Sequence, residues 1–180
     1  MKISTNRLAI RNLQLTDLND FHSYRCLPAV ALYQGFDIMN KEECEKFIRE
    51  YKDKELGKPG EWVQFAIAQK QNDQLVGDCA IKLHAPDPRI AEIGMSISPS
   101  FQQRGYAKEA MLGIMNFLFN QKEVHRIVEI TDAENKASIQ LLKSLGFRQE
   151  GHFIENIWFN NKWGSEYQYA MLRKEWENNF

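Results

Sequence analysis

Apolar and polar residues follow two different periods along this chain. In residues 91–98 apolar side chains alternate with small or polar ones, which predicts a half-buried β-strand that Pro99 ends. Further on, apolar residues recur at steps of three and four, which predicts an amphipathic helix over 105–121. An apolar-rich run over 124–131 predicts a second strand. The three elements form a β-α-β unit, whose two strands we expect to be parallel.

The same two periods predict the elements on either side of this unit. A strand over 3–12 leads into a helix capped by Thr16, and Asn40-Lys-Glu-Glu43 resembles a capping box that opens a helix to about Glu55. Strands are predicted at 62–68, 74–83, 147–159 and 164–172, and Asn135 begins a helix that Gly146 ends. The segments 25–40 and 84–90 are irregular. These elements predict a mixed α/β protein.

Composition narrows the class of protein. A length of 180 residues with 43% hydrophobic residues suits one globular domain spanning 1–180. The net charge is −1 and the pI is near 6.4, which argues against nucleic-acid binding. No apolar run has the length of a signal peptide or a membrane span, so we expect a cytoplasmic protein without a membrane partner.

Metal and disulfide chemistry find little support in the residue pattern. The three cysteines, Cys26, Cys44 and Cys79, lack any C-x-x-C spacing, and free cysteine is most often a small buried residue. The four histidines are scattered without ligand spacing. We therefore expect neither a disulfide framework nor a metal site.

The turn Ser100-Phe-Gln-Gln-Arg-Gly-Tyr-Ala107 joins the strand at 91–98 to the following helix. The first N–H groups of a helix have no intrahelical partner and lie at the positive end of its dipole, so they bind anions. Gly105 allows the backbone to approach a ligand closely. This turn predicts a site for a phosphate or pyrophosphate, with an ordinary strand-to-helix loop as the alternative.

Two motifs in this region resemble those of the Gcn5-related N-acetyltransferases. Gln102-x-x-Gly105-x-Ala107 is similar to the acyl-CoA signature of that family, and Asn135-x-x-Ser138 followed by Leu145-Gly-Phe147 is similar to its second landmark. The first and last strands resemble the branch that contains the ribosomal-protein N-terminal acetyltransferases. The resemblance implies a mostly antiparallel central sheet with a central parallel strand pair and flanking helices.

The resemblance also implies acetyl-CoA as co-substrate, held in a gap between the two parallel strands. The pantetheine arm would use unpaired strand groups in that gap, and the pyrophosphate would contact the backbone around Gly105. The residues expected to bind acetyl-CoA are Met95, Ser96, Ile97, Gln102, Gln103, Arg104, Gly105, Tyr106, Ala107 and Asn135.

Amine acetylation needs a neutral amine and a proton for the departing thiolate. Glu92, on the strand beside the expected thioester, is the first candidate base, acting through water, and Glu155 on a late strand is the second. In the branch that acetylates ribosomal protein L7/L12 a glutamate is proposed as base on this late strand, but the aligned position here is Ile157. Ser138 is the candidate acid for the thiolate. Each residue also has an ordinary structural interpretation, as a solvated carboxylate or a helix-start residue.

Aromatic residues near the irregular segment 25–40 and the last hairpin are the candidates for the acceptor-binding site. Tyr33, Phe36 and Trp158 are the candidate substrate-binding residues, although aromatic residues at strand ends are more often core or edge cover. The resemblance favours a protein N-terminal α-amine. A polyamine, an antibiotic or another small amine is the alternative, and so is a module that binds acetyl-CoA without catalysis. The closing hairpin also suggests a homodimer.

Overall fold

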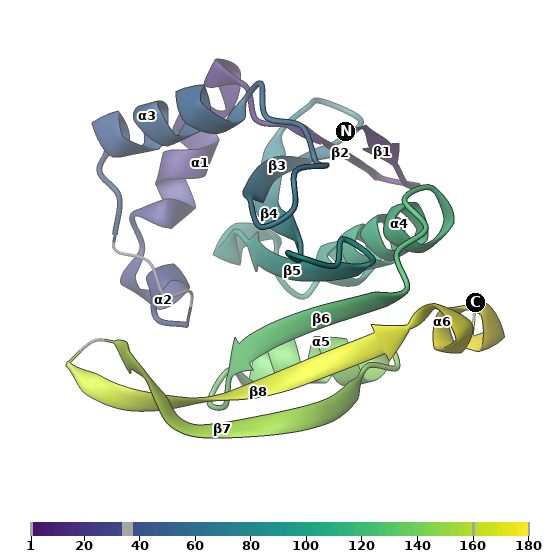
Figure 1. Cartoon of the computed structure of the whole chain (residues 1–180). Helices are drawn as coiled ribbons and strands as arrows, with labels where there is room; N and C mark the ends of the chain where they lie inside the picture. The colour runs from purple at the N-terminus through teal and green to yellow at the C-terminus, as the bar shows by residue number, and fades with distance from the viewer. Residues whose placement is uncertain (1, 34–37, 160, 180) are drawn as a thin grey trace.

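The computed structural model describes residues 2–33, 38–159 and 161–179 (Figure 1). Its helices are the 3-10 turns η1 (Leu15–Asp17) and η2 (Pro99–Phe101) and the α-helices α1 (Leu18–Arg25), α2 (Pro28–Ala31), α3 (Lys41–Tyr51), α4 (Tyr106–Asn120), α5 (Lys136–Ser144) and α6 (Arg173–Asn179). Its strands are β1 (Ile3–Ser4), β2 (Leu8–Asn12), β3 (Trp62–Gln69), β4 (Leu75–Leu83), β5 (Ile90–Ile97), β6 (Arg126–Asp132), β7 (Arg148–Phe159) and β8 (Lys162–Leu172).

All the strands of the described residues join one sheet, in the order β1-β2-β3-β4-β5-β6-β8-β7. Only β5 and β6 run parallel, because α4 carries the chain back across the sheet between them, and the other neighbours are antiparallel. The mixed α/β fold with a central parallel pair is therefore confirmed.

The parallel pair is joined over a short length only. The ladder between β5 and β6 pairs Ile90 with Arg126, Ala91 with Ile127, and Glu92 with Val128. Beyond that point β5 stays paired with β4 and β6 stays paired with β8. The two strands thus separate into a fork, which consists of residues 93–97 of β5 and 129–132 of β6.

Helices cover both faces of the sheet, and each face has its own apolar cluster. Figure 1 shows α1, α2 and α3 gathered on one side, with α4 and α5 behind β5 and β8. Phe21 and Tyr24 of α1 pack with Ile48 of α3 on the first face. On the second face, Ile114 of α4 and Leu142 of α5 belong to the larger cluster, which takes in β5 and β6. The amphipathic pattern of α4 follows from this packing.

Several predicted boundaries are wrong. The predicted strand over 3–12 is divided into β1 and β2 by a short turn, and the predicted helix to about Glu55 ends at Tyr51. Thr16 does not cap a helix, because it lies inside η1, and it is the Asp17 carboxylate that accepts from the backbone N–H of Gln14 at 2.8 Å. The capping box of Asn40 and Glu43 is confirmed.

Two helices were not predicted at all. α2 begins at Pro28 within a segment expected to be irregular, and α6 follows β8 without a break. Cys44 and Cys79 are buried, as expected, and Cys26 is partly buried. Among the helices of the described residues, none combines the length and apolar character needed to cross a membrane.

Candidate active site

The ladder that joins β5 to β6 ends where the fork opens. Each strand keeps its hydrogen-bonded neighbour on the outer side, whereas the last ladder pair between the two strands is Glu92 with Val128. Backbone N–H and C=O groups beyond the end of a ladder need partners other than the neighbouring strand, and the amides of a pantetheine arm are suitable ones. The expected binding residues Met95, Ser96 and Ile97 all lie on this part of β5.

The turn after β5 leads directly into the start of α4. Gln102 anchors it, because its side-chain Nε2 donates to the carbonyl of Ile97 at 3.0 Å. Gln103 and Gly105 have φ values of +59° and +78°, so the backbone curls into the left-handed region just before the helix. Residues 102–105 are exposed. This geometry leaves the first N–H groups of α4 open to an anion.

An ion pair that the sequence did not reveal holds the start of α4 against the first hairpin. Arg7 pairs with Glu109 at 2.6 Å, donates to the carbonyl of Arg104 at 3.1 Å and lies 4.5 Å from the ring centre of Tyr106. Thr5 also donates to Glu109 at 2.6 Å. Burial opposes ionisation of Glu109, but the hydrogen bonds from Thr5 and Arg7 outweigh it and lower the pKa of Glu109.

Asn135 and Ser138 lie at the start of α5, next to the other arm of the fork. The Asn135 side chain accepts from the backbone N–H of Ser138 at 3.1 Å and so caps the helix. The Ser138 hydroxyl donates to Glu129 of β6 at 3.2 Å. Glu129 is 6% exposed, and burial raises its pKa to about 8 against the opposing effect of the Ser138 hydrogen bond.

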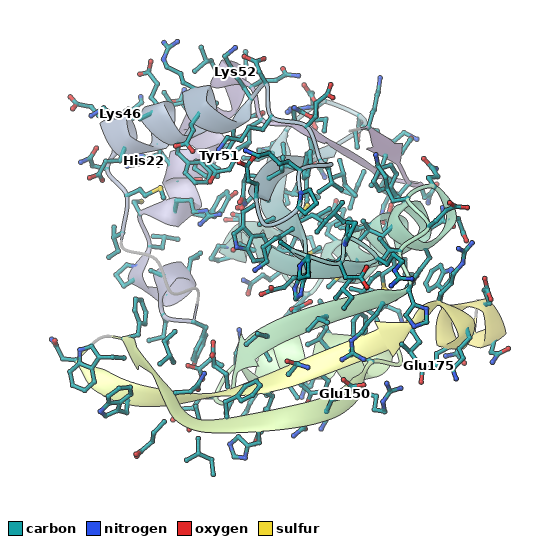
Figure 2. All side chains as sticks on the ribbon, in the orientation of Figure 1. His22, Lys46, Tyr51, Lys52, Glu150 and Glu175 are labelled. Atoms are coloured by element: carbon teal, nitrogen blue, oxygen red, sulfur yellow. The ribbon has the colours of Figure 1, made fainter. Side chains whose placement is uncertain are left out.

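A cavity of about 360 Å³ opens on the α1–α3 face of the sheet, beside the fork. Its lining residues are Arg25, Met39, Phe47, Tyr51, Trp62, Gln64, Asp78, Ala80, Gly94, Met95 and Ser96. Tyr51, labelled in Figure 2, comes from the last turn of α3. Because the cavity reaches Gly94 to Ser96 of β5, it adjoins the position expected for the thioester. A larger hollow of about 560 Å³ lies elsewhere, against Arg11 and Lys52, and no fork residue lines it.

The polar floor of the cavity is a buried, hydrogen-bonded group centred on Asp78. Its carboxylate forms an ion pair with Arg25 and accepts from Gln64 and from the hydroxyl of Tyr24, the last at 2.6 Å. Asp78 is 1% exposed and Arg25 is 5% exposed. Burial and the neighbouring Asp78 raise the pKa of Tyr24 well above its ordinary value, so this hydroxyl remains a donor. The charges of the floor balance each other.

The two candidate bases occupy different surroundings. Glu92, in the last pair before the fork, is bound by Lys82 at 2.7 Å and lies 3.1 Å from Nε2 of His84. Glu155 lies in an irregular part of β7, with a φ of +47°, and its exposed backbone N–H donates to Ser165. Neither residue lines the cavity of about 360 Å³.

Of the predicted acceptor residues, Tyr33 and Trp158 do not line this cavity. Tyr33 follows α2 and is 36% exposed, and Trp158 on β7 is 57% exposed, where it packs edge-on against Trp163. Phe36 lies outside the described residues. The aromatic residues that do line the cavity are Phe47, Tyr51 and Trp62, none of which was predicted.

Some of the missed residues carried a signal in the sequence. Glu129 interrupts the apolar run Ile127-Val128-Glu129-Ile130, and a carboxylate in a buried strand is unusual enough to mark a site. Asp78 likewise follows the apolar residues of β4. In the ranges that the structure describes, no group of three or more His, Cys, Asp or Glu side chains is placed to hold a metal ion.

A parallel strand pair that separates beside a glycine-led helix start is the arrangement expected of an acyl-CoA-dependent N-acyltransferase. Comparison with known proteins agrees. The family model described as an acetyltransferase (GNAT) domain matches residues 7–148, and the chain belongs to this family of Gcn5-related N-acetyltransferases. The protein is therefore an acetyl-CoA-dependent N-acetyltransferase.

Two similar proteins match nearly the whole of this chain. The uncharacterised N-acetyltransferase YnaD of Bacillus subtilis is 30% identical over 98% of this chain and 99% of its own length. A GNAT-family acetyltransferase from Bacillus anthracis matches 97% of this chain and 100% of its own, with a TM-score of 0.88 and 27% identity.

Two further matches have named acceptors. RimL, the ribosomal L7/L12 α-N-protein acetyltransferase solved with coenzyme A, matches 97% of this chain and 99% of its own, with a TM-score of 0.81 and 18% identity. The spermidine N(1)-acetyltransferase of Vibrio cholerae is 26% identical over 50% of this chain and 52% of its own length. These two acceptors, a protein N-terminus and a polyamine, are both amines.

Proposed function

We propose that this acetyltransferase acts on the N-terminal α-amine of a protein or peptide, which enters the cavity on the α1–α3 face. The observation that carries the proposal is the cavity itself. It adjoins Gly94 to Ser96 at the fork, has aromatic walls, and has a floor where Arg25 and Asp78 neutralise each other. A volume of about 360 Å³ is at the small end of ligand sites and suits one terminal residue.

On the donor side, the proposal places the pantetheine arm of acetyl-CoA in the fork, along Met95, Ser96 and Ile97 on one arm and near Asn135 beyond the other. The turn would hold the pyrophosphate through the backbone N–H groups of 103–107. Gln102 would fix the shape of the turn, and the side chains of Arg104 and Tyr106 would lie beside the pyrophosphate. The Ser138 hydroxyl, on the first turn of α5, would protonate the thiolate.

The proton of the acceptor amine would leave through water to Glu92, with Glu155 as the second candidate. Glu92 already binds Lys82 and lies next to His84, so it is not a free carboxylate. It would accept the proton as part of this group of polar side chains. Neutralising a lysine-like amine of pKa about 10.4 at pH 7.4 costs roughly 4 kcal/mol, whereas an α-amine near 7.8 costs less than about 1 kcal/mol. This difference favours an α-amine.

The surroundings of the cavity also favour a single amine over a polyamine. A polyamine carries further ammonium groups that carboxylates would stabilise, and among the residues that the structure describes the one carboxylate lining the cavity, Asp78, is already paired with Arg25. The glutamates at the start of α3 stabilise that helix and are not arranged around the cavity. Glu43 completes the capping box, and Glu45 pairs with Arg49 at 2.6 Å.

A set of matched acceptors tests the proposal. One peptide has a free α-amine and no lysine, a second differs by a blocked N-terminus and by one residue replaced with lysine, and the third acceptor is spermidine. Release of the CoA thiol is followed for each, and mass spectrometry locates the acetyl group. We expect kcat/KM for the free α-amine to exceed the others by about tenfold or more. Faster turnover of spermidine or of the lysine peptide would contradict the proposal.

A pair of tryptophan variants tests the position of the acceptor. Trp62→Ala removes a wall of the cavity, whereas Trp158→Ala removes an exposed side chain of the last hairpin. We expect Trp62→Ala to raise the KM for the acceptor without changing the KM for acetyl-CoA, and Trp158→Ala to change neither. The opposite result would move the acceptor to the last hairpin, which the sequence predicts to form one part of the acceptor site.

A further inference from the structure

Glu129 is the first residue of β6 beyond the last pair of the parallel ladder, so it lies where the fork opens. Its side chain is on the face of the sheet that α5 covers, because it meets Ser138 there. Only 6% of Glu129 is exposed. A carboxyl group is thus buried directly behind the residue that would protonate the thiolate.

The two oxygens of this carboxyl group differ. Oε1 accepts the hydroxyl of Ser138 at 3.2 Å, while Oε2 is buried without a hydrogen-bond partner among the described residues. A buried carboxylate with one unpartnered oxygen and no paired cation is strongly disfavoured, whereas a neutral carboxyl group is tolerated.

Among the described residues, the groups around Glu129 supply no counter-charge. Ser138 faces it from α5, Tyr169 is its neighbour on β8, and Ile127 and Thr131 share its face of β6. Burial, and then the neighbouring Tyr167, raise the pKa of Tyr169, whose hydroxyl donates to Gln149. Burial also raises the pKa of Glu129 to about 8, so most of this carboxyl group is protonated at pH 7.

We propose that Glu129 is a positioning residue that orients the Ser138 hydroxyl toward the departing sulfur and replaces the proton that Ser138 gives up. The inference rests on the acetyl transfer and on the role of Ser138 proposed above, but not on which amine accepts the acetyl group.

The proton balance of the step is complete. The amine attacks the thioester carbonyl, and when the tetrahedral intermediate collapses the C–S bond breaks and its electron pair goes to sulfur. The Ser138 hydroxyl turns from Oε1 of Glu129 to the sulfur and donates its proton to the thiolate, while Oε1 of the protonated Glu129 carboxyl group gives its proton to Ser138 and becomes part of a carboxylate. The amine loses its extra proton through water to Glu92 and from there to solvent, and solvent protonates Glu129 again before the next turnover. The sum is amine plus acetyl-CoA giving amide plus free CoA thiol.

Glu129→Gln separates this role from a merely structural one. Glutamine has nearly the same shape and can accept a hydrogen bond from Ser138 or donate one to it, but it cannot deliver a proton. We expect kcat at pH 7 to fall about tenfold, with the KM for acetyl-CoA within about twofold. The wild-type kcat at saturating substrates should fall above about pH 8, and this fall should be absent from the variant.

The matched control is Glu134→Gln. Glu134 is an exposed glutamate on the connection between β6 and α5, and its carboxylate lies 3.4 Å from the ammonium group of Lys162. Its kcat and pH profile should match those of the wild type. Ser138→Ala completes a double-mutant cycle, in which Glu129→Gln should have little further effect once Ser138 is absent.

The outcomes distinguish this inference from the proposed function. Kinetics are measured with whichever amine the wild type acetylates, so a wrong acceptor assignment leaves the test intact. If Glu129→Gln keeps the wild-type kcat and its fall above pH 8, Glu129 is not the proton source. A second, independent measurement needs no turnover assay. If the unfolding free energies of the wild type and of Glu129→Gln change in parallel from pH 5 to pH 9, Glu129 does not titrate in this range, and the inference is overturned.

Discussion

At the scale of single residues, Glu129 links stability to pH. Its pKa in the folded protein is about 8, raised by burial from an ordinary value of 4.5. Below pH 4.5 the carboxyl group is protonated in both the folded and the unfolded chain, so it favours neither. As the pH rises toward 8, the unfolded chain releases this proton more readily, and the folded state loses stability relative to the unfolded state.

This sign gives a prediction for Glu129→Gln. One pKa unit corresponds to about 1.4 kcal/mol. The free energy of unfolding of the variant, relative to that of the wild type, should therefore increase by several kcal/mol between pH 5 and pH 9. Urea unfolding at the two pH values measures the difference. The Glu134→Gln protein should show no such change, because Glu134 is exposed. An equal difference at both pH values would mean that Glu129 is ionised in the folded protein at pH 5.

At the scale of elements, the start of α4 depends on a residue from the first hairpin. Glu109, on the first turn of α4, receives hydrogen bonds from Thr5 and Arg7, and Arg7 also reaches the carbonyl of Arg104 in the binding turn. The N-terminal hairpin therefore holds the turn in the shape that we propose for pyrophosphate binding.

Glu109→Gln should weaken this connection. The charged pair is partly buried, so we expect a loss of about 1–2 kcal/mol in the free energy of unfolding at pH 7 and a several-fold weaker affinity for CoA. Because the folded pKa of Glu109 is lowered, the stability it contributes is present above its ordinary pKa and is lost on acidification through the lowered value. Calorimetric titration with CoA measures the affinity.

The control for Glu109→Gln is Asp87→Asn, which removes an exposed ion pair with Arg89. An exposed pair contributes little, so both the stability and the affinity for CoA should stay near those of the wild type. If the two variants bound CoA equally well, the hairpin would have no part in shaping the turn.

The same scale explains what could be predicted from the sequence. The β5-α4-β6 unit was predictable because its periodic segments are long and its turn carries a motif, and α3 was predictable from its capping box. α2 has only four residues, which is too short for a periodic signal, and α6 directly continues β8. The aromatic walls of the cavity come from α3 and β3, which are brought together only by tertiary packing.

At the scale of the whole molecule, the fork divides the sheet into two parts. β1 to β5 lie on one side and β6 to β8 on the other, and their shared ladder consists of the three pairs from Ile90 to Glu92. The helices α4 and α5 and the apolar cluster on their face also connect the two parts. A ligand lying in the fork would add contacts where the ladder has ended.

This arrangement predicts where CoA changes backbone protection. On the inner edge of β6, residues 129–132 lie beyond the last ladder pair with β5, so their amide hydrogens on that edge should exchange quickly in the free protein and several times more slowly with CoA bound. Amides of β3 and β4 that are paired within the sheet should show no change beyond the general stabilisation, which is about 2.7 kcal/mol when CoA is present at 100 times its Kd. Hydrogen exchange read by mass spectrometry resolves these segments. Slowing that occurred instead around Arg11 and Lys52 would place CoA in the larger hollow, and the fork would then have no part in binding the donor.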